Sequence, residues 1–112
     1  MNILFLVKLN FLELSQSKLS QVPDGVGRLV HLTSLVLKSN QLTGLPDTLN
    51  SLTSLKLLDV SNNKISCLPS LSQLNMLATI NLALNSLEGD LSIPGLEGCE
   101  KLSVVDVSGG IF

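Results

Sequence analysis

The sequence has very few aromatic side chains. It contains no tryptophan, no tyrosine and three phenylalanines, although hydrophobic residues make up 45% of its 112 positions. Ordinary globular cores use aromatic side chains to fill irregular space. Most of the apolar content here is leucine. Side chains of one kind suit a structure that repeats the same packing arrangement, so the composition argues against an irregular globular core.

Clustered charge is also missing. The formal net charge is −2, and the seven basic residues are spread along the chain without a run. Proteins that bind nucleic acid group lysine and arginine to neutralise phosphates, and those that bind single strands add aromatic side chains for stacking. We therefore expect no direct contact with nucleic acid.

Signals for secretion, membrane insertion and metal binding are absent as well. Cys67 and Cys99 fit neither the CxxC spacing of metal sites nor the disulfide framework of small secreted domains. The sequence has no Asn-x-Ser/Thr site, and no apolar run approaches the roughly 20 residues of a membrane span. The apolar stretch from Ile3 to Val7 is too short for a signal peptide. We expect a cytoplasmic protein that does not enter a membrane.

What the sequence does contain is one pattern, repeated. The units begin at five leucines, which are Leu9, Leu32, Leu55, Leu77 and Leu102. Successive starts are 23, 23, 22 and 25 residues apart. Apolar residues recur at the fourth and sixth positions of every unit, and the ninth position is most often asparagine. The alternation at positions four to six is typical of a short strand with one buried face.

The repeats resemble a known family. The segments LTSLVLKSNQL (32–42) and LKLLDVSNNKI (55–65) are similar to the LxxLxLxxNxL signature of leucine-rich repeats, and Leu45-Pro46 and Leu68-Pro69 resemble the turn of the intracellular type. The resemblance implies an α/β fold, a leucine-rich-repeat solenoid. Such a solenoid is a right-handed β–α superhelix shaped like a horseshoe, with a short-stranded parallel sheet on its concave face. One unit cannot bury its leucines alone, so the units must stack.

The resemblance covers nearly the whole chain, so we predict a single array over residues 1–112. Its predicted parts are a partial repeat at 1–8, complete repeats at 9–31, 32–54, 55–76 and 77–101, and a partial repeat at 102–112. Both ends fall inside a unit and lack cysteine-rich caps, so we interpret the chain as a piece of a longer protein. In the fourth complete repeat, Gly89 and Ile93-Pro94 resemble the plant-type variant but with one extra residue.

The asparagines at position nine have a structural role in this family. The resemblance implies that they hydrogen-bond neighbouring backbone groups inside the stack and form a ladder, here Asn40, Asn63 and Asn85. Ser17 and Gly110 take this position in the first and last units. A buried amide without partners would cost about 1–3 kcal/mol.

Binding residues are expected on the strand face that points away from the core. The side chains of positions three, five, seven and eight face the concave side, because side chains alternate along a strand. The predicted partner-binding residues are Phe11, Glu13, Ser34, Val36, Lys38, Leu57, Asp59, Thr79, Asn81 and Asp106. Phe11 and Leu57 are the predicted anchors, because large desolvated side chains dominate interface energy. The acidic members would steer a basic partner.

The sequence offers no grouping of residues for catalysis, a cofactor or a metal. The single histidine, His31, precedes a repeat start, where a solvated side chain is typical. Gly25-Val26-Gly27 lacks the spacing of a phosphate-binding GxGxxG loop. Cys99 takes the place of a buried aliphatic residue, and Cys67 falls in the turn after Ile65. We expect a protein that is not an enzyme.

Three functions are compatible with these features. The favoured one is a scaffold or adaptor segment in signalling that binds another protein, of open identity, on the concave sheet face. The second is the recognition arm of a larger protein whose other domain is a kinase, a ubiquitin ligase or an RNA-associated, tRNA-synthetase-like domain. The third, an extracellular receptor or matrix repeat, is disfavoured because sequons and a signal peptide are missing. The sequence leaves open the oligomeric state and whether the concave or the convex face binds.

Overall fold

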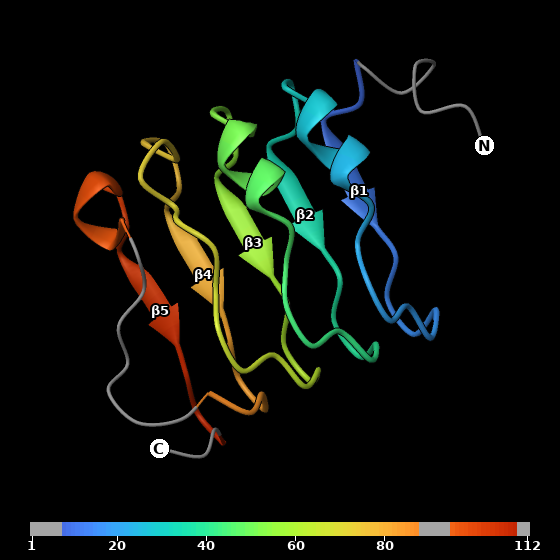
Figure 1. Cartoon of the computed structure of the whole chain (residues 1–112). Coiled ribbons are helices and arrows are strands. Elements are labelled where there is room, and N and C mark those ends of the chain that lie inside the picture. The colour runs from blue at the N-terminus through green and yellow to red at the C-terminus, as the bar shows by residue number, and fades with distance from the viewer. Residues whose placement is uncertain (1–7, 88–94, 110–112) are drawn as a thin grey trace.

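The computed structural model describes residues 8–87 and 95–109, which form a stack of similar turns around one sheet (Figure 1). The sheet has five strands of three residues each, in the order of the sequence. The strands are β1 (Phe11–Glu13), β2 (Ser34–Val36), β3 (Leu57–Asp59), β4 (Thr79–Asn81) and β5 (Val104–Asp106). The predicted solenoid with a short-stranded parallel sheet is confirmed.

The strands pair in parallel and in step with the repeat. The central residues of the strands are Cα partners across the whole sheet, and they are Leu12, Leu35, Leu58, Ile80 and Val105. All five hold position four of their units. Each step of the sheet therefore advances the chain by one repeat, and residues at equal positions form rows across the strands.

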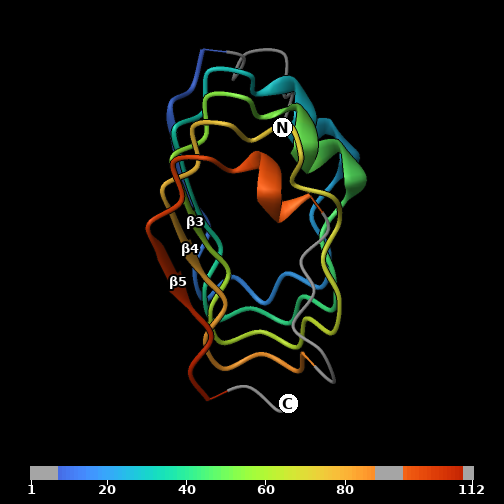
Figure 2. The same cartoon turned by 90° about the vertical axis from the view of Figure 1, so that its left-hand side faces the viewer.

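Short 3-10 helices cover the side of the coil opposite the sheet (Figure 2). They are η2 (Asp24–Arg28), η3 (Asp47–Ser51) and η4 (Leu96–Gly98). Pro23 and Pro46 precede η2 and η3, each with the φ near −65° that proline imposes. A 3-10 helix rises about 2.0 Å per residue against 1.5 Å in an α-helix. A 3-10 helix therefore spans the return path with fewer residues. The return segments contain 3-10 helices, whereas the term β–α superhelix suggests α-helices.

The core lies between the sheet and the return segments and is almost entirely aliphatic. Leu35, Leu58 and Ile80 of the strands have no exposed surface. Leu49 and Leu71 of the return segments are equally buried. Full burial of such a side chain contributes about 1.5–3 kcal/mol. Because the same positions repeat in each turn, the leucines of one turn cover those of the next.

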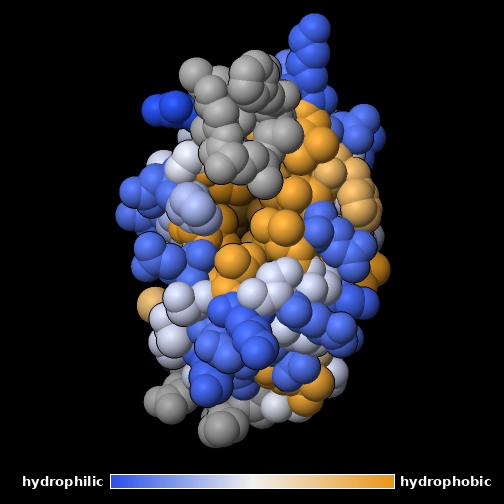
Figure 3. Space-filling model, turned by 90° about the vertical axis from the view of Figure 1, so that its right-hand side faces the viewer, coloured by the Kyte–Doolittle hydropathy of each residue, from blue (hydrophilic) through white to orange (hydrophobic). Residues whose placement is uncertain are grey.

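The outermost units bury less of the same pattern. Leu14, at position six of the first unit, is 38% exposed, and Val105, at position four of the last, is 41% exposed. Both residues hold core-facing positions but keep part of their surface exposed, because among the described residues each has a neighbouring turn on one side. At the β1 end, apolar atoms surround the hollowed centre of the coil (Figure 3). In the described part of the chain, no helix has the length and apolarity that a bilayer crossing requires.

Candidate functional site

The outer face of the sheet carries two rows of side chains that the pairing aligns across all five strands. Row three holds Phe11, Ser34, Leu57, Thr79 and Val104. Row five holds Glu13, Val36, Asp59, Asn81 and Asp106. The strands thus bring nine of the ten predicted binding residues onto one face, and Lys38 follows at position seven, just beyond the end of β2.

Row three is apolar at its two edges and its centre. Phe11 is 52% exposed on β1 and Val104 is 50% exposed on β5, whereas Leu57 on the middle strand is half-buried. Ser34 and Thr79 separate them. Neighbouring strands are about 4.8 Å apart, so Phe11 and Leu57 lie roughly 10 Å from each other. The two predicted anchors are therefore separated by the width of one strand.

On β3, β4 and β5 the polar side chain of row five holds the backbone where the strand ends. Oδ1 of Asp59 accepts a hydrogen bond from the backbone N–H of Ser61 at 3.0 Å. Asn81 and Asp106 accept from the N–H groups two residues further on, at 3.0 and 2.9 Å. These are Asx turns, in which a short side chain replaces a backbone acceptor. The recurrence of Asp or Asn at position five in three successive units was the signal for this role, which sequence reasoning missed.

This bonding also affects charge. The hydrogen bonds from Ser108, first from its backbone N–H and then from its side chain, lower the pKa of Asp106. The carboxylate is therefore fixed in position and stays ionised. Glu13 on β1 differs, since its Oε1 accepts a bond from the Ser15 hydroxyl at 3.2 Å.

Val36 does not suit the binding role predicted for it. Only 9% of its surface is exposed. Its Cα partners on the flanking strands are Glu13 and Asp59, whose longer side chains stand beside it. Val36 therefore offers a partner little surface, and β2 contributes mainly Ser34 and the exposed Lys38.

A third row, row eight, forms the rim where the strands turn away from the sheet. It consists of Gln16, Ser39, Asn62, Leu84 and Gly109. All five have positive φ, between 55° and 72°. Nδ2 of Asn62 donates to Oγ of Ser39 at 3.1 Å, which links two members of the row. The left-handed turn at position eight was not expected from the sequence, because four of the five residues are not glycine.

The asparagines at position nine lie inside the stack. Asn40, Asn63 and Asn85 are 5–9% exposed. Nδ2 of Asn63 donates to the carbonyls of Leu37 and Val60 at 3.1 and 2.9 Å, and its Oδ1 accepts from the N–H of Leu42 at 3.0 Å. Asn40 and Asn85 make corresponding bonds to their own and the preceding unit. Within the described residues, no buried side-chain nitrogen or oxygen is left without a hydrogen-bond partner.

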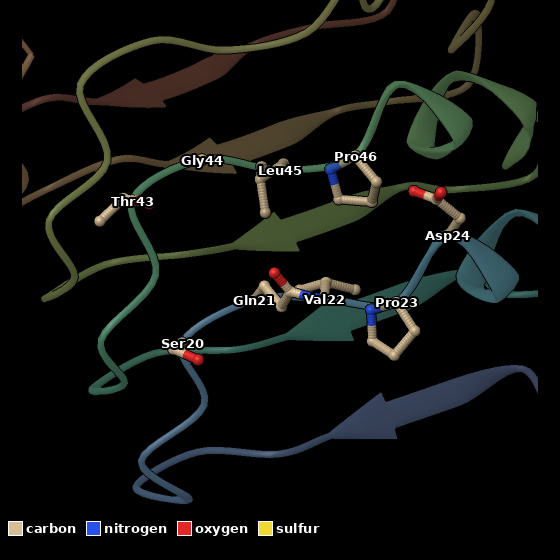
Figure 4. Close-up of a pocket in the computed structure, with 9 residues that line it drawn as sticks. All are labelled: Ser20, Gln21, Val22, Pro23, Asp24, Thr43, Gly44, Leu45 and Pro46. Atoms are coloured by element: carbon tan, nitrogen blue, oxygen red, sulfur yellow. The ribbon is translucent and has the colours of Figure 1, made fainter.

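A shallow groove lies on the return side, between residues 20–24 and 43–46 of two successive units (Figure 4). Oγ1 of Thr48 donates to the carbonyl of Asp24, one of the lining residues, at 2.8 Å. Asp24 is the one ionisable side chain among the lining residues. The groove thus lacks the second positioned group that acid–base catalysis needs.

The remaining reactive side chains are not grouped. Cys99 is buried, and its thiol lies 3.4 Å from the carbonyl oxygen of Leu71. Burial raises the pKa of the Cys99 thiol, and the charge of Glu97 raises it further. Cys67 is free and exposed. Among residues 8–87 and 95–109, no three His, Cys, Asp or Glu residues lie close enough to hold a metal ion.

Comparison with known proteins agrees with this geometry. The sequence model of a family described as "Leucine rich repeat" matches residues 30–87. The solved structure of a leucine-rich-repeat protein of Leptospira interrogans superimposes with a TM-score of 0.78 and is 26% identical. The match covers 97% of this chain and 34% of that protein, so the chain spans about a third of its length. No curated protein matches the sequence.

Proposed function

Because the chain belongs to the leucine-rich-repeat family, we propose that it binds another protein on the outer face of its five-stranded sheet. The family is generally a non-enzymatic binding module. The observation that carries the proposal is the alignment of rows three and five across the sheet. Partly exposed side chains on a hydrogen-bonded backbone can meet a partner with little loss of conformational freedom.

The two rows offer a partner two different kinds of contact. Phe11, Leu57 and Val104 offer apolar contacts, and desolvated large side chains supply most of the energy of an interface. Glu13, Asp59 and Asp106 form an acidic line beside them, and such charges speed the approach of a basic partner. A partner with a basic and partly apolar surface fits both rows.

We place this binding in the cytoplasm and propose a scaffold or adaptor role in signalling. Cys67 and Cys99 are both free, as is usual where thiols are kept reduced. The alternative, a recognition arm for a kinase, ubiquitin-ligase or RNA-associated domain elsewhere in a larger protein, stays a prediction. In both cases the sheet face makes the contact, and the partner is a protein.

The double variant Phe11→Ala/Leu57→Asp tests the binding face. The full chain, in its wild-type or variant form, is used to capture proteins from cell lysates. The captured proteins are quantified by mass spectrometry. We expect the partner to be lost from the variant and kept by a control, Val30→Asp, which places an acid on an exposed valine outside the strands. Far-UV circular dichroism checks that both variants fold. A captured set that is the same for wild type and double variant would refute binding on this face.

A further inference from the structure

The outer face of the sheet repeats its character at every second strand. β1, β3 and β5 each carry an apolar side chain in row three and an acid in row five, as Phe11 with Glu13, Leu57 with Asp59, and Val104 with Asp106. The strands between them, β2 and β4, carry the short side chains of Ser34 and Thr79 in row three and no acid in row five. The same pair of contacts is therefore offered three times across the face.

Row three alternates between longer and shorter side chains. Phe11 and Val104 are about half exposed and Leu57 is partly exposed. Ser34 and Thr79 are the Cα partners that stand between these three residues. A partner's side chain comes closest to the sheet where the row is short, so an apolar side chain over each of the two shorter residues would contact an apolar residue on both sides. Two such side chains would cover the whole apolar part of the row.

The distance between these two positions selects the conformation of the partner. Neighbouring strands are about 4.8 Å apart, so Ser34 on β2 and Thr79 on β4 lie roughly 10 Å from each other. Residues seven positions apart in an α-helix are separated by about 10.5 Å and point to the same side. Residues on the same side of an extended strand are about 6.6 or 13 Å apart, which does not match. A polyproline helix repeats at about 9.3 Å, but such helices dock in aromatic-lined grooves, and Phe11 is the one aromatic residue in the two rows.

An α-helix is also wide enough to contact both rows. Rows three and five are two residues apart along each strand, which is about 6.6 Å, and a helix with its side chains is about 10–12 Å across. The rows themselves contain no basic residue, since Lys56 precedes row three by one position and Lys38 follows row five by two. Backbone N–H groups two residues further on hold the carboxylates of Asp59 and Asp106 at 3.0 and 2.9 Å. Row five therefore presents positioned negative charge beside the line of apolar contacts.

We propose that the partner presents an α-helix that lies across the five strands. Its large apolar side chains are seven residues apart and stand over Ser34 and Thr79, and lysine or arginine flanks them on the side of row five. These cations meet the acids of β1, β3 and β5, which follow the same step of two strands. Opposite charge favours a basic helix over an acidic one, because like charges brought together at an interface are costly. This inference rests on the proposed function and specifies the conformation and the chemistry of the partner.

The probe is a displayed library of random peptides three heptads long, selected on the full wild-type chain. We expect the enriched peptides to carry apolar residues seven positions apart, each flanked by Lys or Arg. One enriched peptide is then synthesised as selected and with a central polar residue replaced by proline, which breaks a helix. Affinity is measured by fluorescence anisotropy, and the proline form should bind about tenfold more weakly or worse.

The variant Ser34→Leu tests the spacing. It adds apolar area to the face, so a surface that merely attracts apolar groups would bind the peptide more tightly. If a side chain of the helix stands over Ser34, the larger residue obstructs it, and affinity should fall about tenfold. The matched control is Ser51→Leu, which changes an exposed serine of η3 on the return side and should leave affinity unchanged.

The variant Asp59→Asn tests the charge. Asn81 accepts a backbone N–H at the same position in β4, so the substitution removes the charge and keeps the turn. Peptide binding should weaken and depend less on salt. The matched control is Asp47→Asn, which removes one exposed acid from η3 and should change neither quantity. Thermal denaturation followed by circular dichroism verifies that every variant is folded.

The outcomes separate this inference from the proposed function. Enriched peptides with another spacing or without basic residues, a proline form that binds as tightly as its parent, or tighter binding to Ser34→Leu would overturn the helix. So would a library from which no peptide is enriched. If in any of these cases Phe11→Ala/Leu57→Asp still loses its captured partner, the sheet face remains the binding surface and only the helix is refuted. An unchanged set of captured proteins in addition would refute both.

Discussion

Replacing Asn63 with leucine tests whether the buried amides hold successive turns together. Asn63 is 7% exposed, and its side chain bonds to backbone groups of two units. Leucine has a similar volume but neither a donor nor an acceptor. The substitution therefore removes hydrogen bonds while leaving the shape of the core nearly unchanged.

The expected cost follows from which backbone groups lose their partners. The carbonyls of Leu37 and Val60 keep a donor, because Nδ2 of Asn40 bonds the first at 2.9 Å and Nδ2 of Asn85 bonds the second at 3.0 Å. The N–H of Leu42 donates to Oδ1 of Asn63. After the substitution this N–H, which belongs to a fully buried residue, has no hydrogen-bond acceptor. A stranded buried group costs about 1–3 kcal/mol. We expect the free energy of unfolding to fall by that amount.

The measurement is guanidinium denaturation followed by far-UV circular dichroism, since the chain has no tryptophan or tyrosine to report by fluorescence. Native-state hydrogen exchange adds a local readout, in which the Leu42 amide should lose more protection than its neighbours. The control is Ser17→Leu, the same position in the first unit. Ser17 is exposed, so the control should change stability by less than about 0.5 kcal/mol.

Two results would contradict this reasoning. One is an Asn63→Leu protein with the wild-type denaturation midpoint, because the loss of the acceptor for the Leu42 N–H would then not lower the free energy of unfolding. The other is an equal loss in Ser17→Leu, which would show that leucine at position nine is harmful irrespective of burial.

Two further predictions concern packing and reactivity. A Cβ on Gly27 would lie 2.8 Å from the backbone oxygen of Thr48, whereas nothing lies within 4 Å of one on Gly44. Gly27→Ala should therefore lower the melting temperature and Gly44→Ala should stabilise by about 0.4–1 kcal/mol; equal shifts in calorimetry would argue against the close approach of η2 and η3. Maleimide should label Cys67 in the native protein and Cys99 only in denaturant, because burial encloses the Cys99 thiol and raises its pKa. Mass spectrometry that finds both labelled at equal rates would refute this.

The period of the leucines predicts the sheet almost completely. Units of nearly equal length place Leu35, Leu58 and Ile80 at the same height, and the aligned register follows because a one-residue slip would turn each strand's apolar side outward. The rows of the outer face follow from the same register. The predicted plant-type variant with Gly89 and Ile93-Pro94 lies outside the described residues, as do most of the partial repeat 1–8 and the end of the partial repeat 102–112.

Other features depend on contacts that the pattern does not encode. The left-handed turn at Leu84 opposes the preference of a bulky residue and is imposed by the neighbouring turns. The burial of Val36 depends on the side chains beside it, and the exposure of Leu14 depends on its place at the edge of the stack. Asp59 and Asp106 were predicted only as charges that steer a basic partner, and their bonds to the N–H groups of Ser61 and Ser108 depend on the local path of the backbone.

The buried amides give the array a direction. Asn40 completes the turn of residues 17–19, Asn63 that of Leu42, and Asn85 that of Ile65, so each of these three turns receives its acceptor from the unit that comes after it. Removing the β1 unit takes away the carbonyls of Leu14 and Asn10 that groups of the second unit donate to, whereas removing the unit of Asn63 takes away the side-chain acceptor of the Leu42 N–H. The side-chain acceptors of these turns all lie on the C-terminal side, so a turn keeps its acceptor only while the following unit stays folded.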